Sequence, residues 1–365
     1  MAGIYIHIPF CKQACHYCNF HFATSLHYKN DFVAALLKEI TFQKGYLDNE
    51  LVETIYLGGG TPSLLSVDEL ALIITKINSS FNVQAGTEIT LEANPDDITE
   101  EKLLEWKQTG INRLSIGIQS FFEEDLKWMN RAHNAQQAID SLQLAVKHFD
   151  NITIDLIYGT PQLTNEKWKQ NVDTAISLNI PHLSCYALTV EPKTPLDKMI
   201  KQRKSDDINP DNQSEQFLLL IQWLEEAGYE HYEISNFAKP DMRSRHNSSY
   251  WQGKKYLGLG PSAHSFNGAE RQWNIANNNI YIESINNGKT PFEKEELTAT
   301  QKLNEYVMTS LRTIEGLNLA ITGNHLLEKS KKFIDSGLMK LKNNSLVLTR
   351  EGKLLADGIA AELFF

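Results

Sequence analysis

Cysteine is scarce in this sequence of 365 residues, which contains four of them. Cys11, Cys15 and Cys18 lie close together near the start, and Cys185 stands alone. This distribution excludes a disulfide framework, in which cysteines are spread along a small secreted domain. The four thiols are therefore expected to remain reduced.

Long hydrophobic runs are also absent. No stretch approaches the roughly 20 apolar residues that a membrane-spanning helix requires. The residues from Met1 to Phe10 carry no cluster of positive charge and alternate in polarity like a strand, which argues against a signal peptide. We therefore expect a cytoplasmic protein, in a compartment that keeps thiols reduced.

Positive charge is in deficit, because 35 basic side chains oppose 45 acidic ones and give a net charge of −10. An acidic surface repels phosphate groups, so general binding to nucleic acid or to anionic membranes is disfavoured. A local basic pocket is still compatible with this balance. The hydrophobic fraction of 42% is ordinary for a soluble globular protein.

Short apolar segments alternate with amphipathic helical segments over the first two-thirds of the chain. The expected strands are Ile4–Ile8, Thr54–Leu57, Glu88–Ala93, Arg113–Ile118, Ile152–Ile157 and Leu183–Leu188. The expected helices are Asp31–Lys44, Val67–Phe81, Glu100–Thr109, Ala135–His148, Glu166–Leu178 and Glu215–Ala227. Strands alternating with helices of this length are typical of α/β folds that are built from βαβ units around a parallel sheet.

The pattern changes near residue 290, and we expect two domains, over residues 1–290 and 291–365. Thr298 and Gln301 have the spacing of a capping box and predict the start of a helix. A short strand over Ser345–Leu348 and a final helix follow. The second domain is therefore expected to be a small α+β module that resembles a winged helix. Given the acidic balance of the chain, a structural or substrate-capping role is favoured for it over nucleic-acid binding.

The three clustered cysteines directly follow the first expected strand. Three thiolates on one short loop can ligate three irons of a cubane cluster and leave the fourth iron without a protein ligand. The alternative is a zinc-stabilised binding module, in which His16 or His21 completes a set of three cysteines and one histidine. Zinc motifs usually consist of two separated ligand pairs, and no second pair follows here, so the iron–sulfur interpretation is favoured.

Polar residues stand at or near the ends of several expected strands. Glu92 and Asn94 end the third strand, Gln119 ends the fourth, and Asp155 lies within the fifth. The second strand runs into three glycines, whose backbone can approach a ligand closely. Residues that bind ligands collect at the carboxyl ends of the strands in a parallel barrel. The sequence therefore predicts one shared ligand site. Arg131, beyond the fourth strand, is a candidate partner for a carboxylate or phosphate, with a surface ion pair as the alternative interpretation.

Two motifs carry a family resemblance: residues 5–18 read YIHIPFCKQACHYC, and residues 58–63 read GGGTPS. They closely resemble the radical SAM family that contains oxygen-independent coproporphyrinogen III oxidases and HemW-type haem chaperones, and the similarity covers almost the whole chain. The resemblance implies a partial (β/α)6 TIM-like barrel with a [4Fe–4S] cluster on Cys11, Cys15 and Cys18, whose open iron binds S-adenosylmethionine (SAM). It also implies SAM contacts at Tyr5, Tyr17, Gly60, Thr61, Glu92, Gln119, Arg131 and Asp155.

The resemblance implies two competing functions. One is the oxidative decarboxylation of coproporphyrinogen III, and the other is the binding of haem and its delivery to acceptor proteins, membrane haemoproteins among them. The oxidases carry a fourth cysteine two residues after the third, where this chain has Phe20, and an N-terminal extension for which we expect no room here. The chaperone is therefore favoured, with the cleavage of SAM left open. A tRNA-modifying radical enzyme is a further alternative, against which the acidic balance counts.

A later motif supports haem binding. Residues 246–251 read HNSSYW, which resembles the HNRxYW signature associated with haem in the chaperone group. Imidazole is a common axial ligand of haem iron, so His246 is the first candidate ligand, although Ser248 replaces the usual arginine. His264, in the glycine-rich segment that follows, is the second candidate. A structural histidine in an aromatic-rich loop is the alternative interpretation of His246.

Overall fold

The computed structural model describes all 365 residues, and six parallel strands in chain order form the centre of its main sheet. They are β1 (Ala2–Ile8), β2 (Val52–Gly59), β3 (Val83–Ala93), β4 (Arg113–Gln119), β5 (Ile152–Tyr158) and β6 (His182–Ala187). All six agree with the expected strands, with ends shifted by a few residues. The predicted α/β class with a parallel sheet is therefore confirmed.

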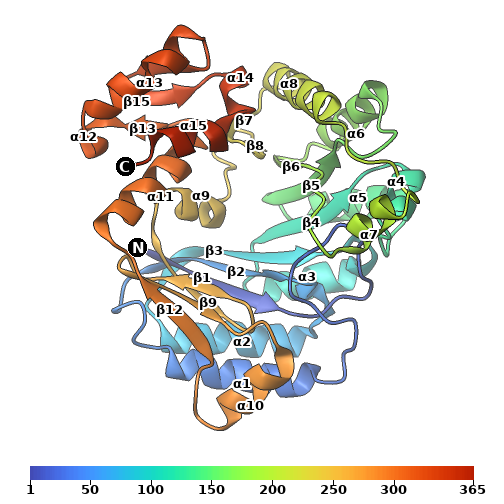
Figure 1. Ribbon diagram of the computed structural model, residues 1–365. Coiled ribbons are helices and arrows are strands. Elements are labelled where there is room, and N and C mark those ends of the chain that lie inside the picture. The colour runs from blue at the N-terminus through green and yellow to red at the C-terminus, as the bar shows by residue number, and fades with distance from the viewer.

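Helices cover the outer face of this curved sheet (Figure 1). They are α1 (Lys29–Phe42), α2 (Val67–Ser80), α3 (Glu100–Gln108), α5 (Ala135–His148), α6 (Asn165–Ser177) and α8 (Pro210–Glu226). On β1, the fully buried Ile4 and Ile8 belong to the core shared with these helices, which includes Trp106. Successive side chains of a strand point to opposite faces, so Tyr5 and His7 face the inside of the curve.

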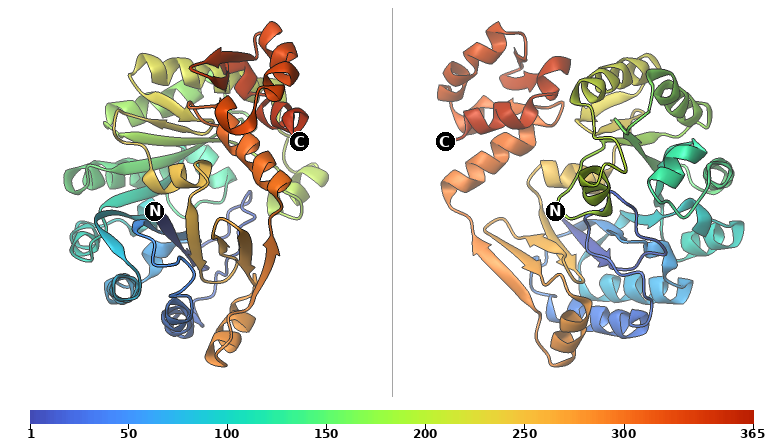
Figure 2. Two further views of the ribbon diagram at one scale, coloured as in Figure 1. Left: turned by 90° about the vertical axis from the view of Figure 1, so that its left-hand side faces the viewer. Right: turned by 45° about the vertical axis from the view of Figure 1, so that its right-hand side comes forward.

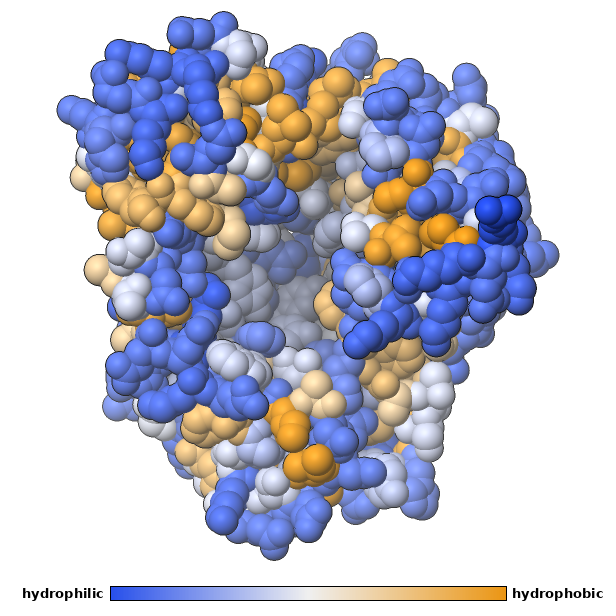
Figure 3. Space-filling model, in the orientation of Figure 1, coloured by the Kyte–Doolittle hydropathy of each residue, from blue (hydrophilic) through white to orange (hydrophobic).

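The sheet continues beyond the six central strands on both sides. Strand β9 (Lys255–Leu259) pairs in parallel with the free edge of β1, and β10 (His264–Phe266), β11 (Glu270–Asn274) and β12 (Phe292–Glu296) extend it antiparallel. At the opposite end, β8 (Asn236–Ala238) pairs with β6 and β7 (Glu230–Glu233) pairs with β8. The result is an open sheet of 12 strands that curves around a hollow, visible at the centre of Figure 3.

Short elements connect the larger ones. They are η1 (Pro62–Leu64), η2 (Pro95–Asp97), α4 (Glu123–Trp128), α7 (Pro195–Lys201), α9 (Arg245–Trp251) and α10 (Asn278–Asn286). Helix α7 lies beside the loop that follows β1, and α9 lies near the chain start, at the opposite end of the strands (Figure 1).

The C-terminal residues form a small module with a core of its own. Its elements are α11 (Ala299–Leu311), β13 (Leu317–Asn318), α12 (Leu319–Thr322), α13 (His325–Asp335), β14 (Met339–Lys342), β15 (Ser345–Leu348), α14 (Arg350–Lys353) and α15 (Ala356–Leu363). The predicted capping box of Thr298 and Gln301 is present at the start of α11. The small sheet has three strands in the order β13-β15-β14, of which β15 is the predicted strand over Ser345–Leu348.

The junction between the two parts lies a few residues after the expected division at residue 290. Strand β12 still pairs with β11 of the main sheet, whereas the buried residues of the second core begin in α11. Figure 2 shows β12 and α11 running along one side of the molecule into the module. No helix combines the length and the apolar character that crossing a membrane would require.

Candidate functional site

The cysteine loop follows β1 at the carboxyl end of the parallel strands. Phe10, 1% exposed, anchors its start. The backbone N–H groups of Cys11 and His16 donate to the carbonyl oxygens of Ala23 and Met129, at 3.0 and 3.1 Å. The three predicted cluster ligands are half-buried free thiols. The loop is thus held by its backbone while its thiols stay accessible.

One arginine connects this loop with the strand ends. Nη1 of Arg131 lies 3.3 Å from Sγ of Cys15 and 3.4 Å from Oη of Tyr17. Its Nη2 donates to Oδ1 of Asn94 and to the carbonyl oxygen of Gly117, each at 2.8 Å. The guanidinium is a permanent positive charge with several N–H donors, so it places a cation directly beside this sulfur. Tyr17 and Arg131, both predicted site residues, therefore lie together against a predicted cluster ligand.

Burial changes the proton affinity of the other two thiols of the loop. It raises the pKa of Cys11 to about 11, although a hydrogen bond with Thr61 opposes the shift. Burial likewise raises the pKa of Cys18. As free thiols these groups hold their protons at neutral pH, so a metal must displace the protons to bind. No three His, Cys, Asp or Glu side chains converge where a single metal ion could bind.

The glycine turn after β2 packs directly against the start of the cysteine loop. The backbone N–H of Gly60 donates to the carbonyl of Ile8 at 2.8 Å, and that of Thr61 donates to the carbonyl of Phe10 at 2.6 Å. A Cβ at Gly60 would lie 2.5 Å from the same Phe10 oxygen, closer than van der Waals contact allows. Glycine is therefore needed here for the close approach of two backbone segments.

Glu92 lies on the inner face at the end of β3. Its Oε1 accepts a hydrogen bond from the hydroxyl of Tyr56 at 2.8 Å, and its Oε2 accepts one from the N–H of Gly59 at 3.1 Å. Burial raises the pKa of Glu92 to about 7. Tyr5 stacks on Tyr56, with ring centroids 6.1 Å apart. Tyr56 was not predicted as a site residue. Its position on β2, two residues before Gly58, nevertheless places its side chain on the same face of the sheet as Glu92.

The ends of β4 and β5 contribute Gln119 and Asp155. The side chain of Gln119 is 7% exposed. Its backbone has a φ of 68° and lies at a register shift between β4 and β5. Such an irregularity changes the direction of a side chain relative to the regular alternation of a strand. A Cβ at Gly117 would lie 3.1 Å from both the Gln119 amide and the Arg131 guanidinium, so these side chains meet above Gly117. Burial raises the pKa of Asp155 to about 6. The predicted residues thus gather at one end of the sheet.

His246 lies at the other end of the strands. Its Nδ1 is 2.8 Å from Oγ1 of Thr54, and its Nε2 is 2.9 Å from the hydroxyl of Tyr250. The ring is 1% exposed, and Gly3 leaves the space that it occupies. Burial lowers its pKa to about 3. Because both ring nitrogens already have partners, the arrangement does not favour His246 as an axial haem ligand.

His264 lies at the same end as the cysteine loop. The turn after β9 packs against the end of β1, where a Cβ at Gly260 would lie 2.5 Å from the carbonyl of His7. The imidazole of His264 is exposed, forms no hydrogen bond within the chain, and stacks on Trp273 at a centroid distance of 6.2 Å. The second candidate ligand is therefore accessible, in contrast to the first.

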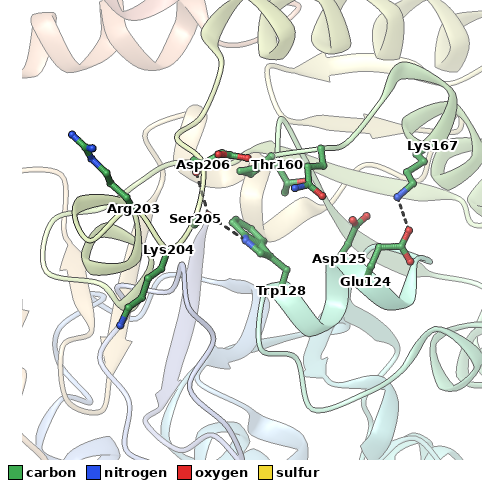
Figure 4. A pocket seen from close by; sticks show the side chains of 11 residues that line it. Glu124, Asp125, Trp128, Thr160, Lys167, Arg203, Lys204, Ser205 and Asp206 are labelled. Atoms are coloured by element: carbon green, nitrogen blue, oxygen red, sulfur yellow. Dashed lines mark hydrogen bonds and ion pairs between the residues drawn. The ribbon is translucent and has the colours of Figure 1, made fainter.

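A polar pocket of about 260 Å³ lies beside the cysteine loop, between α4 and the loops after β5 and α7 (Figure 4). Trp128 forms part of its wall; its indole N–H donates to Ser205 at 3.3 Å, and its carbonyl lies 2.7 Å from Nδ1 of His16. In Figure 4, Arg203 and Lys204 point away from the other labelled side chains. None of the predicted site residues lines this pocket, so it is a neighbour of the site and not a part of it.

The sequence matches curated relatives over almost its full length. It is 33% identical to the haem chaperone HemW of Mycobacterium tuberculosis over 367 residues, which cover 99% of this chain and 94% of the relative. The chain belongs to the HemW family. HemW of Bacillus subtilis is 32% identical, with 98% of each chain covered, and HemW of Escherichia coli is 37% identical over 72% of this chain and 69% of its own.

Two broader comparisons agree with the HemW assignment. The radical SAM superfamily model matches residues 5–175, which include the cysteine loop and the first five strands. A solved structure of coproporphyrinogen III oxidase (HemN) from Escherichia coli, described as a radical SAM enzyme, superposes with a TM-score of 0.85 at 24% identity. It covers all of this chain and 90% of that one, which confirms the radical SAM architecture.

The residues present fit the cofactors of this superfamily. Three thiols share one loop, and a guanidinium lies beside the middle one. Two carboxyl groups on the inner face, Glu92 and Asp155, have pKa values raised by burial and therefore favour a cationic partner. Such a donor set suits an iron–sulfur cluster together with a ligand that carries an ammonium group and hydroxyls.

Proposed function

We propose that the chain holds a [4Fe–4S] cluster and SAM at the carboxyl ends of its parallel strands and acts as a haem chaperone. In this role it binds haem and delivers it to an acceptor protein. The observation that supports the proposal most is the similarity to HemW proteins over nearly the whole length of both chains, together with three cysteines on one anchored loop.

In this proposal Cys11, Cys15 and Cys18 ligate three irons. Arg131 then offsets part of the negative charge that three thiolates bring to a half-buried loop. The hydrogen bonds of Arg131 to Asn94 and Gly117 keep the guanidinium in place whether or not the cluster is present. Because the cluster needs reduced thiols, we place the protein in the cytoplasm.

SAM would lie across the strand ends, in contact with the eight residues that the family resemblance implies. Glu92 and Asp155 would receive the ammonium group and the ribose hydroxyls, and Gln119 would bind through its amide. The backbone at Gly60 and Thr61 would hold the methionyl end. When bound, the cluster and SAM supply one-electron chemistry, while the chain binds, orients and shields them.

One anaerobic preparation tests the proposal. After reconstitution we expect about four irons per chain, as a cubane requires, and a saturable haem-binding step. We also expect no decarboxylation of coproporphyrinogen III, because Phe20, 67% exposed, stands where the oxidases carry a further cysteine. Zinc in place of iron would contradict the cluster, and turnover of coproporphyrinogen would favour the oxidase over the chaperone.

A further inference from the structure

The hairpin of β10 and β11 presents a face of unusual composition. His264 pairs across the hairpin with Trp273, and Phe266 pairs with Arg271, so all four side chains share one face. The imidazole of His264 is exposed and the other three side chains are half-exposed. The face thus combines a metal-ligating nitrogen, aromatic surface and a cation.

The haem-associated motif HNSSYW reaches this face through its tyrosine and not through its histidine. Tyr250 packs edge-on against Tyr256, with ring centroids 4.7 Å apart, and Tyr256 lies 6.3 Å from Phe266. Meanwhile His246 is closed in by its hydrogen bonds to Tyr250 and Thr54. An unbroken row of aromatic rings therefore runs from the motif to the hairpin.

We infer that the face of His264, Phe266, Arg271 and Trp273 binds haem, with His264 as the axial ligand of the iron. This inference rests on the proposed chaperone function and assigns its binding site. Haem is a flat apolar plate with two carboxylates at one edge, and the face offers a matching partner for each part. Aromatic rings receive the plate, imidazole binds the iron, and the guanidinium of Arg271 attracts a propionate.

The surroundings of His264 support an imidazole ligand. The ring of His264 is exposed and forms no hydrogen bond within the chain, so its nitrogens are free to bind iron. Arg271 is paired with Glu305 of α11 at 2.9 Å, and a propionate would compete with that carboxylate.

Haem titration of the reconstituted protein tests the site. In His264→Ala we expect the Soret band to lose its imidazole-ligated position and haem affinity to fall roughly tenfold or more. In His264→Cys we expect a thiolate-ligated spectrum, a change that loss of packing alone would not produce. The matched control is His325→Ala, which removes another exposed imidazole, one that packs edge-on against Phe365 in the C-terminal module.

The outcomes separate the site from the function. Wild-type spectra in both His264 variants would overturn the placement while leaving the haem chaperone intact. Absence of haem binding in the wild-type protein would instead overturn the proposed function itself. Arg271→Gln, with the spectrum of the wild type but weaker binding, would support the propionate contact, and unchanged affinity in that variant would remove it.

Discussion

The two ends of the inner face differ in what their polar groups bind. At the amino-terminal end, the carboxylate of Glu88 accepts hydrogen bonds from the N–H groups of Arg245 and His246, at 3.1 and 2.9 Å, and lies 4.0 Å from Nε of Arg113. At the carboxyl-terminal end, Glu92 and Asp155 keep raised pKa values and Arg131 reaches a cysteine sulfur.

This difference distinguishes buried polar groups that stabilise the fold from buried polar groups that are available to a ligand. Burying a polar group costs free energy unless it is hydrogen-bonded, so a fold normally satisfies such groups internally. At the amino-terminal end, helix α9 supplies His246, whose ring nitrogens lie within hydrogen-bond distance of Thr54 and Tyr250, while Nε of Arg113 is left with the Glu88 charge alone. The carboxyl-terminal end leaves charged groups that a cationic cofactor and a metal cluster can satisfy.

Removing a cysteine of the loop should have the largest effect. Cys15→Ala takes away one of three iron ligands and the sulfur beside Arg131, so we expect complete loss of the cluster, from about four irons per chain to none. Iron and sulfide analysis with the visible spectrum measures this. Cys185→Ala is the matched control, because that thiol is 2% exposed in the core of β6 and should leave iron content unchanged. A cluster that survives in Cys15→Ala would rule out the assigned ligands.

Neutralising a carboxylate at each end should separate binding from stability. Asp155→Asn should weaken SAM binding by roughly tenfold to a hundredfold, since a charge-assisted hydrogen bond contributes about 1.5–3 kcal/mol. Glu88→Gln should leave SAM affinity unchanged and lower the denaturant midpoint, because Arg113 loses its neighbouring carboxylate. Equilibrium dialysis and urea unfolding measure the two effects. Equal SAM affinity in both variants would remove Asp155 from the site.

His246→Ala should destabilise the protein and leave its iron content unchanged. The change leaves the hydroxyls of Thr54 and Tyr250 without a partner and opens a buried cavity, so we expect a loss of about 2–4 kcal/mol in the free energy of unfolding. Tyr250→Phe removes one of these hydrogen bonds and should cost about 1 kcal/mol. Urea unfolding measures both. A loss below about 0.5 kcal/mol in His246→Ala would contradict a structural role for the buried ring.

The last effect concerns pH. The pKa of Glu92 is raised from 4.5 to about 7 in the folded chain, so the folded state binds this proton more tightly than the unfolded state does. Stability should therefore fall as pH rises from about 4.5 to about 7, and the decline should end above that range. Unfolding free energies of the cofactor-free protein across this range, compared with those of Glu92→Gln, measure the effect. The same slope in the variant would assign the pH dependence to other groups.

Much of the fold could be predicted because the hydrophobic residues recur with a different period in its strands and in its helices. The six central strands and their helices follow alternating and helical hydrophobic patterns, and the capping box of Thr298 and Gln301 is present. Strands β7 to β12 were not predicted, because they are short or polar. In β12 the residues Phe292–Glu296 are all exposed, so no buried face marks the strand.

For the site, sequence alone indicated which residues gather but not how they are partnered. Because the carboxyl ends of parallel strands meet at one edge of a sheet, Glu92, Gln119 and Asp155 were predicted to lie close together, and in the structure they do. It could not show that Arg131 contacts Cys15, because that contact joins loops more than 100 residues apart. Nor could a motif show that both nitrogens of His246 are occupied, since its partner Thr54 lies on β2.

The position of β1 at the middle of the sheet has a consequence for synthesis on the ribosome. Strand β1 acquires β2 within the first 59 residues, but its other neighbour, β9, ends at Leu259. At elongation rates of 5–20 residues per second, one edge of the first strand waits about 10–40 s for its partner. During that interval the unpaired edge of β1 can pair with other chains, so β1 is exposed to aggregation until β9 has been made.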